Sequence, residues 1–513
     1  MSLQFITGNS GNGKTKYLFN RIVKEAKANP RDNYLVIVPE QFTMQTQRQL
    51  VDLSENKAIM NIDVLSFKRL AYRVFDELGI TNLTVLEETG KNLVLRKLAA
   101  QEADKLGVIG RNLNRIGYIS EVKSLLSELV QYNISPEELG RYIASGRLSD
   151  TLSDKLKDVL VLYEAFEKFM QDKYITAEEI LNVLSNVAEE SAILRNSVIA
   201  FDEFTGFTPI QNQLIKKLFV ISKKIYVTLT IDCREDIFKS RGMQELFDMP
   251  KRTVKSLTEM AAFYGIEVEE PIILDKNYRL AENEELSFME QQLFRKRRCS
   301  FKKVPKHIHI DCLRDPKQEL TKIARRINEL VRNENLRYRD IAIVTGDVNI
   351  YAGYVREIFD KYNIPYFIDA TQEILFHPFI EFIRSIPDIA AQNFSADAVF
   401  RFLRCGFSEL LDSEIDVLEN YVLACGVRGK SAWDKKWVRL PKHKAGYDLE
   451  LLNQSREYIM ELLKPVYQVF SNKKSTVKDY VLAIYKLIVL LDIPDKLAKK
   501  EQALLDAGDQ TAS

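Results

Sequence analysis

The amino-acid sequence predicts an α/β fold in which parallel sheets alternate with all-helical subdomains. Residues 3–7 have the apolar character of a strand, a glycine-rich turn and a helical segment follow, and a second strand is expected at 34–39. Strand, loop, helix and strand in this order make a βαβ unit, which implies a parallel sheet. From about 85 to 190 apolar residues recur every three or four positions, as in helices, and strand patterns return at 197–201 and 225–231.

The order of these segments predicts how the chain is divided into domains. Residues 1–84 and 191–300 are expected to form one domain, into which the helical stretch 85–190 is inserted. A second α/β domain is expected to begin with residues 301–375, which contain the strand-like segments HIHIDC, DIAIVTG and IPYFID. Residues 376–513 are again helical. Because no closing strand or capped helix finishes them, we expect a truncated helical insertion.

Composition narrows the class of protein but not its function. The 513 residues are 46% hydrophobic, enough for roughly three or four domains of ordinary size. With 73 basic and 72 acidic residues, the charge balance neither requires nor excludes a nucleic-acid partner. The five cysteines are scattered, without disulfide or metal-ligand spacing. No signal peptide or membrane-length apolar run is present, so we expect a cytoplasmic protein with no membrane partner.

One segment near the N-terminus matches the G-x-x-x-x-G-K-[ST] pattern of nucleotide-binding loops in full. Its residues are Gly8, Asn9, Ser10, Gly11, Asn12, Gly13, Lys14 and Thr15. Glycines let successive backbone N–H groups face phosphate oxygens, and the following helix directs its positive end at the same anion. Lys14 would neutralise the β- and γ-phosphates of ATP, and Thr15 would donate a hydroxyl ligand to Mg²⁺. The alternative is a chance glycine turn, but the flanking strand and helix favour a nucleotide site.

A nucleotide loop should be matched by a carboxylate at the end of another strand of the same sheet. The apolar segment SVIAF is followed directly by Asp202 and Glu203. Asp202 would hold Mg²⁺ through water, and Glu203 would orient or deprotonate the attacking water. The alternative is an ordinary strand that ends in two surface acids. Together with the glycine loop, the pair predicts a P-loop nucleotide site.

The segment DKNYRL further along the chain resembles the NYR segment of UvrD-like helicases. In those proteins the arginine reaches the γ-phosphate, so the resemblance assigns that role to Arg279. Three residues taken alone are equally compatible with chance. The α/β segments of 301–375 also resemble the second motor domain of that superfamily. The expected architecture is therefore a set of UvrD/RecA-like P-loop motor domains with helical insertions.

Four segments in combination resemble AddB, the second subunit of the bacterial AddAB helicase–nucleases. They are Val38–Thr43, Leu65–Leu70, Phe201–Pro209 and Leu418–Tyr421, and the resemblance covers essentially the whole chain. It implies the N-terminal part of a subunit that pairs with an AddA-type helicase–nuclease as a heterodimer. Such complexes process double-strand breaks for homologous recombination, bind single- and double-stranded DNA, and recognise a Chi-type sequence. In full-length members the nuclease domain and its four-cysteine iron–sulfur cluster lie near the C-terminus, so neither is expected here.

The same resemblance suggests which residues contact DNA. They are Gln41, Thr43, Phe67, Arg69 and Phe207, which stand just beyond strand ends or on segments that face DNA in this motor class. Aromatic rings stack on bases, whereas Gln, Thr and Arg side chains read base edges. For each the alternative is a core or capping role. Phe67 has helical apolar spacing and fits core packing nearly as well, Arg69 could lie on a solvated face, and Phe207 is the better stacking candidate.

A basic run without acids is a further candidate for phosphate contacts. It comprises Arg295, Lys296, Arg297 and Arg298, followed by Lys302 and Lys303. Such a run could grip DNA phosphates with a marked salt dependence, but it is more often a solvated linker between domains.

Three departures from active helicases limit the expected activity. Only seven residues precede the loop, which leaves no room for an upstream adenine-reading segment. The third strand ends at Thr230–Cys233 without the glutamine that senses the γ-phosphate, and no arginine finger is visible. ATP binding is therefore expected and hydrolysis is not. The leading hypothesis is a DNA-scanning subunit that depends on its AddA-type partner. The alternatives are an autonomous UvrD-like helicase and a DNA-binding scaffold with a vestigial loop.

Overall fold

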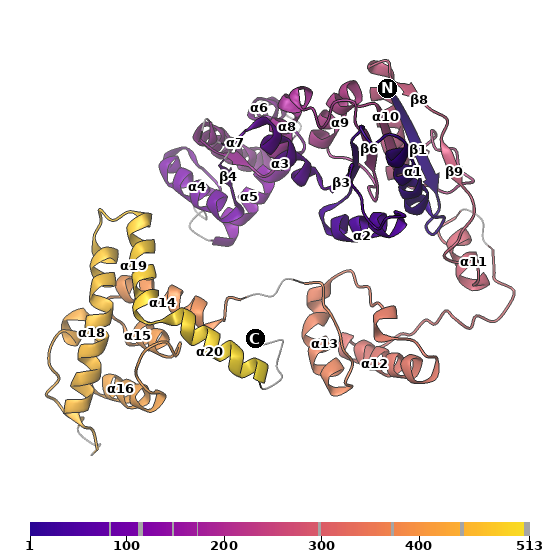
Figure 1. Ribbon diagram of the computed structural model, residues 1–513. Coiled ribbons are helices and arrows are strands. Elements are labelled where there is room, and N and C mark those ends of the chain that lie inside the picture. The colour runs from indigo at the N-terminus through magenta and orange to yellow at the C-terminus, as the bar shows by residue number, and fades with distance from the viewer. Residues whose placement is uncertain are drawn as a thin grey trace. The chain divides into compact units, whose positions relative to one another are not determined.

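The structure is a computed structural model that describes residues 1–81, 84–110, 116–145, 148–171, 173–295, 299–370, 374–441 and 446–506. The chain forms two compact units, Met1–Ile310 and Asp311–Ser513, and each is described by itself (Figure 1). Within the described ranges, no helix has the length and apolar character needed to cross a bilayer.

The first unit is built on a seven-stranded sheet in which every described pairing is parallel. The strand order is β3-β2-β6-β7-β1-β8, and β9 also pairs with β1. The strands are β1 (Ser2–Gly8), β2 (Tyr34–Ile37), β3 (Ile62–Leu65), β6 (Val198–Phe201), β7 (Lys224–Thr230), β8 (Glu267–Val268) and β9 (Ile272–Leu274). The predicted α/β fold with a parallel sheet is thereby confirmed.

Helices cover both faces of this sheet, as alternate strand residues require. Phe5 and Ile6 are neighbours in β1, yet they belong to different hydrophobic clusters on opposite sides. The Ile6 side packs against α1 (Lys14–Ala28) and α2 (Thr43–Leu53). The Phe5 side packs against α3 (Phe67–Leu78), α8 (Ile180–Val187), α9 (Pro209–Ile221) and α10 (Asp248–Phe263). The final helix of this unit is α11 (Glu284–Gln292).

A helical subdomain lies between β3 and β6 in the chain and has a hydrophobic core of its own (Figure 1). Its helices are α4 (Glu88–Gln101), α5 (Ile116–Gln131), α6 (Pro136–Ala144) and α7 (Asp150–Met170). The chain enters and leaves it through β4 (Val85–Leu86) and β5 (Ile175–Thr176), which pair in parallel. Inside it, the buried Lys91 ammonium pairs with Glu178 at 2.7 Å and with Glu88 at 2.9 Å.

Among the residues that the structure describes, the second unit consists of helices and irregular segments. Its first two helices pack on one another through a small apolar core that includes Leu320 and Phe359. The remaining helices share a larger core around Trp433. The helices are α12 (Pro316–Asn333), α13 (Val348–Lys361), α14 (Pro378–Ala391), α15 (Ala396–Leu403), α16 (Asp412–Cys425), α17 (Lys430–Trp433), α18 (Leu449–Ser471), α19 (Val477–Leu490) and α20 (Ile493–Asp506).

The strands expected within 301–375 are absent from the described part of that range, so this expectation was wrong. The segments HIHIDC, DIAIVTG and IPYFID are irregular and pair with no neighbour. Ile310 and Val344, whose apolar pattern predicted burial, are each 93% exposed. A strand is stable only beside a hydrogen-bonded partner, and no described residue pairs as a strand with any of these three segments. A second motor domain therefore stays a prediction.

Candidate nucleotide-binding site

The glycine-rich loop connects the end of β1 to the start of α1. Gly11 and Gly13 have φ values of 88° and 79°, in the left-handed region that glycine adopts without strain. A Cβ on Gly11 would lie 2.8 Å from both the Cβ of Arg279 and the Oδ1 of Asn277. Gly13 is the N-cap of α1, so Lys14 and Thr15 occupy the first turn, where unpaired N–H groups favour an anion.

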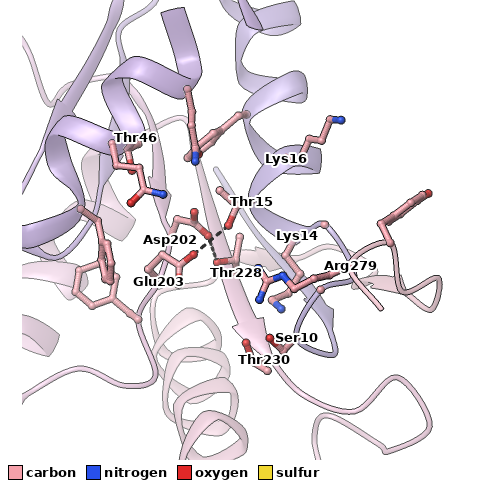
Figure 2. Close-up of a pocket in the computed structure, with 18 of the residues that line it drawn as sticks. Ser10, Lys14, Thr15, Lys16, Thr46, Asp202, Glu203, Thr228, Thr230 and Arg279 are labelled. Carbon is pink, nitrogen blue, oxygen red and sulfur yellow. Dashed lines mark hydrogen bonds between the residues drawn. The ribbon is translucent and has the colours of Figure 1, made fainter. Parts of the chain in front are cut away.

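A pocket of about 760 Å³ opens beside this loop. The Lys14 ammonium lies within it and donates a hydrogen bond to the carbonyl oxygen of Asn9 at 3.0 Å. Burial lowers the pKa of Lys14, although the nearby Glu203 and Asp202 oppose that shift. The polar residues of the lining are Ser10, Lys14, Thr15, Lys16, Gln45, Thr46, Gln49, Asp52, Asp202, Glu203, Thr205, Thr228, Thr230, Tyr278 and Arg279. The predicted phosphate and carboxylate groups thus line one cavity (Figure 2).

Asp202 and Glu203 stand on the loop that leaves β6. Figure 2 shows the Thr228 hydroxyl bonded to Asp202 and the Thr15 hydroxyl bonded to Glu203, the latter at 3.3 Å. Asp202 is buried, and its second carboxylate oxygen has no partner among the described residues. Burial raises the pKa of Asp202. An orphaned carboxylate oxygen beside a threonine hydroxyl is a donor set of the kind Mg²⁺ accepts.

Glu203 has an unusual backbone conformation, with φ at 63°. A residue with a side chain adopts the left-handed region at a cost of about 1–3 kcal/mol, which the surrounding fold must offset. Here the conformation turns the chain sharply after the strand, and the carboxylate reaches Thr15 on α1. Strain of this kind concentrates at functional sites.

The segment that contains Arg279 is fastened directly onto the glycine loop. The backbone N–H groups of Tyr278 and Arg279 donate to the Gly11 carbonyl at 2.9 and 3.3 Å. The Asn277 amide donates to the Ser10 carbonyl at 2.9 Å. Arg279 therefore lies beside Lys14 in the pocket (Figure 2). The sequence-based prediction missed Asn277 and Tyr278, because nothing in the three-residue match indicated contact with the loop.

The phenylalanines assigned to DNA contacts form one aromatic cluster. The Phe67 ring is only 7% exposed and lies 5.8 Å from Phe201, 5.5 Å from Phe204 and 6.3 Å from Phe207, measured between ring centroids. A ring enclosed in this way has no free face for a base, so the assignment of Phe67 to base stacking was wrong and its core alternative fits. Phe207 is only partly buried.

The polar residues that were assigned to DNA contacts lie around Glu40. The Arg69 guanidinium pairs with Glu40 at 3.1 Å, and the Ser66 hydroxyl donates to the same carboxylate. The buried Thr43 hydroxyl donates to the Glu40 carbonyl at 3.0 Å at the start of α2. Phe42, not Thr43, is the N-cap of α2, but the Thr43 side chain is held within the fold and has no free edge for a base, so its assignment to DNA was wrong. Gln41 is exposed to solvent.

The basic run is described only in part, because residues 296–298 lie outside the described residues. The Arg295 guanidinium is mostly buried, pairs with Asp232 at 3.0 Å and lies 4.8 Å from the ring centroid of Phe247. Lys303 forms an exposed ion pair with Glu284 at 2.5 Å. Arg295 is thus held within the fold by an ion pair, which fits neither the candidate phosphate contact nor the solvated linker that the sequence favoured for this run.

Comparison with known proteins identifies relatives of this chain. The family model described as "ADDB, N-terminal" matches residues 5–290. The B subunit of the ATP-dependent helicase/deoxyribonuclease of Lachnoclostridium phytofermentans is 38% identical over 504 residues, 97% of this chain and 44% of that protein. The proteins of the same name from Clostridium tetani and Clostridium acetobutylicum are 32% and 31% identical over 97% and 99% of this chain, or 44% and 45% of their own length. The chain thus spans less than half the length of these relatives.

Proposed function

The chain belongs to the family of ATP-dependent helicase/deoxyribonuclease B subunits, and we propose that it is the ATP- and DNA-binding N-terminal part of such a protein. The observation that carries this proposal is the complete phosphate-loop pattern, set between β1 and α1, with Asp202 in the same pocket at the end of β6, which β7 separates from β1. The relatives' name describes one component of an enzyme complex, so a partner protein and a DNA substrate are part of the proposal.

The pocket supports ATP binding through its own residues. Backbone N–H groups of the loop and the N-terminus of α1 would hold the phosphates, and Lys14 would neutralise them. Arg279 would add charge at the γ-phosphate. Mg²⁺, which screens phosphate charge when bound, would be held by Thr15 and, through water, by Asp202. Tyr278, which is 65% exposed at the pocket, offers a ring face to the remainder of the nucleotide.

Binding is better supported than turnover. Glu203 is close enough to Thr15 to orient a water molecule at the metal, but Thr230 stands at the end of β7, where active motors carry glutamine. We therefore propose that this protein binds ATP without hydrolysing it. DNA unwinding is assigned to an AddA-type partner in a heterodimer. That complex would process double-strand breaks for recombination and respond to a Chi-type sequence.

Two of the residues that are candidates for DNA contact are accessible to single-stranded DNA. Gln41 is exposed just beyond β2, and Phe207 is partly exposed on the loop that leaves β6. The carboxyl ends of parallel strands meet at one edge of the sheet, which is where ligands of such folds bind. A strand of DNA that lies along this edge would meet an amide that reads bases and a ring that stacks on them.

Isothermal titration of the chain with MgATP tests the proposal, with Lys14→Ala as the variant and Lys24→Ala, an exposed lysine of the same helix, as the control. Wild type and control should bind with similar affinity, and Lys14→Ala should lose binding. Unchanged binding in Lys14→Ala would favour a scaffold with a vestigial loop. An ATPase rate stimulated by single-stranded DNA would favour an autonomous helicase.

A further inference from the structure

We infer that Glu290 on α11 is a positioning residue of the nucleotide loop. We also infer that α11 relays nucleotide occupancy to residues 299–310, the linker that precedes the second unit. This inference rests on the proposed ATP binding. It depends on three sets of contacts, at the loop, along α11 and at the linker, all of which lie within the first unit.

The first set of contacts centres on Asn9 of the loop, which is 5% exposed. Its side-chain amide donates to Glu290 at 2.8 Å, and its side-chain oxygen accepts from the backbone N–H of Cys233 at 2.9 Å. Its backbone carbonyl accepts a hydrogen bond from the Lys14 ammonium at 3.0 Å. One buried residue therefore joins the phosphate-binding lysine, the end of β7 and α11.

The second set fixes the C-terminal end of α11 to the sheet. Asp232, which follows β7, accepts hydrogen bonds from Arg295 at 3.0 Å and from Arg234 at 2.6 Å. Although burial opposes ionisation, the hydrogen bonds from Arg234 hold the pKa of Asp232 well below its ordinary value. Arg234 also donates to the Gln291 carbonyl at 3.0 Å. Asp232 is buried and Arg295 is mostly buried, whereas Arg234 is half exposed. Paired charges thus hold the segment that follows α11, and one exposed hydrogen bond ties the end of the helix itself to the sheet.

The third set fastens the linker along α11. The Glu285 carboxylate accepts from the backbone N–H groups of Lys306 and His307, each at 2.8 Å. The rings of Phe288 and Phe301 lie 5.3 Å apart between centroids. The linker thus folds back on the helix that holds Asn9, only a few residues before the second unit begins at Asp311.

Phosphate binding must disturb the first set of contacts. A triphosphate attracts the Lys14 ammonium, so the lysine leaves the Asn9 carbonyl. The Asn9 side chain stays held by Glu290, so a shift of the loop pulls on α11 beside the C-terminal end that Arg234 ties to the sheet. The helix then tilts at its other end, where Glu285 holds the linker. Occupied and empty loops should therefore differ in how firmly α11 holds the linker.

Hydrogen exchange of the whole chain, with and without saturating MgATP, tests this relay. In the wild type, MgATP should slow exchange of the backbone amides of Lys306 and His307 by about threefold or more. In Glu290→Ala the response should disappear, and nucleotide affinity should fall by about tenfold. Glu290→Gln keeps an acceptor for the Asn9 amide and should retain the response. Glu282→Ala, an exposed glutamate just before the helix, is the charge-matched control.

The outcomes separate the relay from the nucleotide site itself. If titration shows no MgATP binding by the wild type, the proposed function fails and the relay falls with it. If MgATP binds but the linker amides do not respond, or if saturated Glu290→Ala responds like the wild type, the relay alone is overturned. Circular dichroism of each variant identifies a folding defect. Should Glu290→Ala fail to fold, Glu290→Leu, which keeps most of the side-chain volume but accepts no hydrogen bond, replaces it: loss of the response at saturating MgATP supports the relay, and its retention overturns it.

Discussion

Asp202 and Thr228 lie on adjacent strands of the parallel sheet, and the Thr228 hydroxyl donates a hydrogen bond to one oxygen of the buried Asp202 carboxylate. The other oxygen has no partner among the described residues. Threonine therefore fixes the carboxylate in one orientation and leaves its second oxygen available. A carboxylate held in this way has the orientation that the proposed water-mediated contact with Mg²⁺ requires, and burial raises its pKa.

This raised pKa predicts opposite pH effects on binding and on stability. Mg²⁺ needs the ionised carboxylate, so affinity for MgATP should fall as pH falls towards the ordinary range of an aspartate, and should begin to fall at a higher pH than an ordinary aspartate would allow. The folded protein binds the Asp202 proton more tightly than the unfolded chain, so this group's contribution to the free energy of unfolding should rise over the same fall in pH. Titration and thermal melts of wild type and Asp202→Asn check both trends, which the variant should lack.

Gly11→Ala should weaken nucleotide binding by displacing the segment that contains Arg279. The new Cβ would meet the Arg279 Cβ and the Asn277 Oδ1 at 2.8 Å, and the residue has a φ of 88°. Gly79→Ala is the matched control, since Gly79 has a φ of 67° and no atom within 4 Å of an added Cβ. Both should lose about 1–2 kcal/mol through the left-handed backbone. Only Gly11→Ala should bind MgATP at least about tenfold more weakly, and equal affinity in the two variants would contradict the steric argument.

Phe67→Ala and Phe207→Ala should have different effects. The Phe67 ring is buried among other rings, so its loss should lower the free energy of unfolding by about 3–5 kcal/mol. Phe207 is only partly buried, so its removal should cost less stability but weaken single-stranded DNA binding by about 1–3 kcal/mol. Denaturant melts and fluorescence anisotropy with a labelled oligonucleotide measure the two quantities. DNA binding by Phe207→Ala that equals the wild type would remove Phe207 from the interface.

Lys91→Ala should destabilise the helical subdomain strongly. It leaves the Glu178 carboxylate, which pairs with Lys91 at 2.7 Å, buried without its cation. The expected loss in free energy of unfolding is about 3–5 kcal/mol, whereas Lys91→Met combined with Glu178→Leu should recover most of it. Lys157→Ala, which breaks an exposed pair with Asp154, should change stability by less than about 1 kcal/mol in the same melts.

The sequence predicted the parts of the site that are local in the chain. Residues Gly8–Thr15 form a loop whose pattern is complete within one segment, and Asp202 follows an apolar strand, so both were found without a structure. Contacts between distant residues could not be predicted in this way. Neither the bond from Asn277 to the Ser10 carbonyl nor that from Asn9 to Glu290 leaves a periodic or compositional signal.

Apolar patterns were informative only where a partner surface exists. The helical spacing around Phe67 correctly allowed for a core position, and the strand at 197–201 lies within the parallel sheet as β6. The same kind of pattern at Val344 predicted a strand, yet the side chain is exposed and the segment pairs with nothing among the described residues. Strand patterning describes what a segment can bury, but pairing depends on residues elsewhere in the chain.

The short strands β4 and β5 pair with one another, so the helical subdomain is joined to the rest of its unit at one place. Val85 and Ile175 are register partners, so the entrance and exit of the subdomain are neighbours, and its hydrophobic core is separate from that of the sheet. A turn of a few residues could close the chain between them. Genetic exchange of everything in between would leave the glycine-rich loop and its carboxylates undisturbed, so this subdomain can diverge in sequence independently of the proposed nucleotide site.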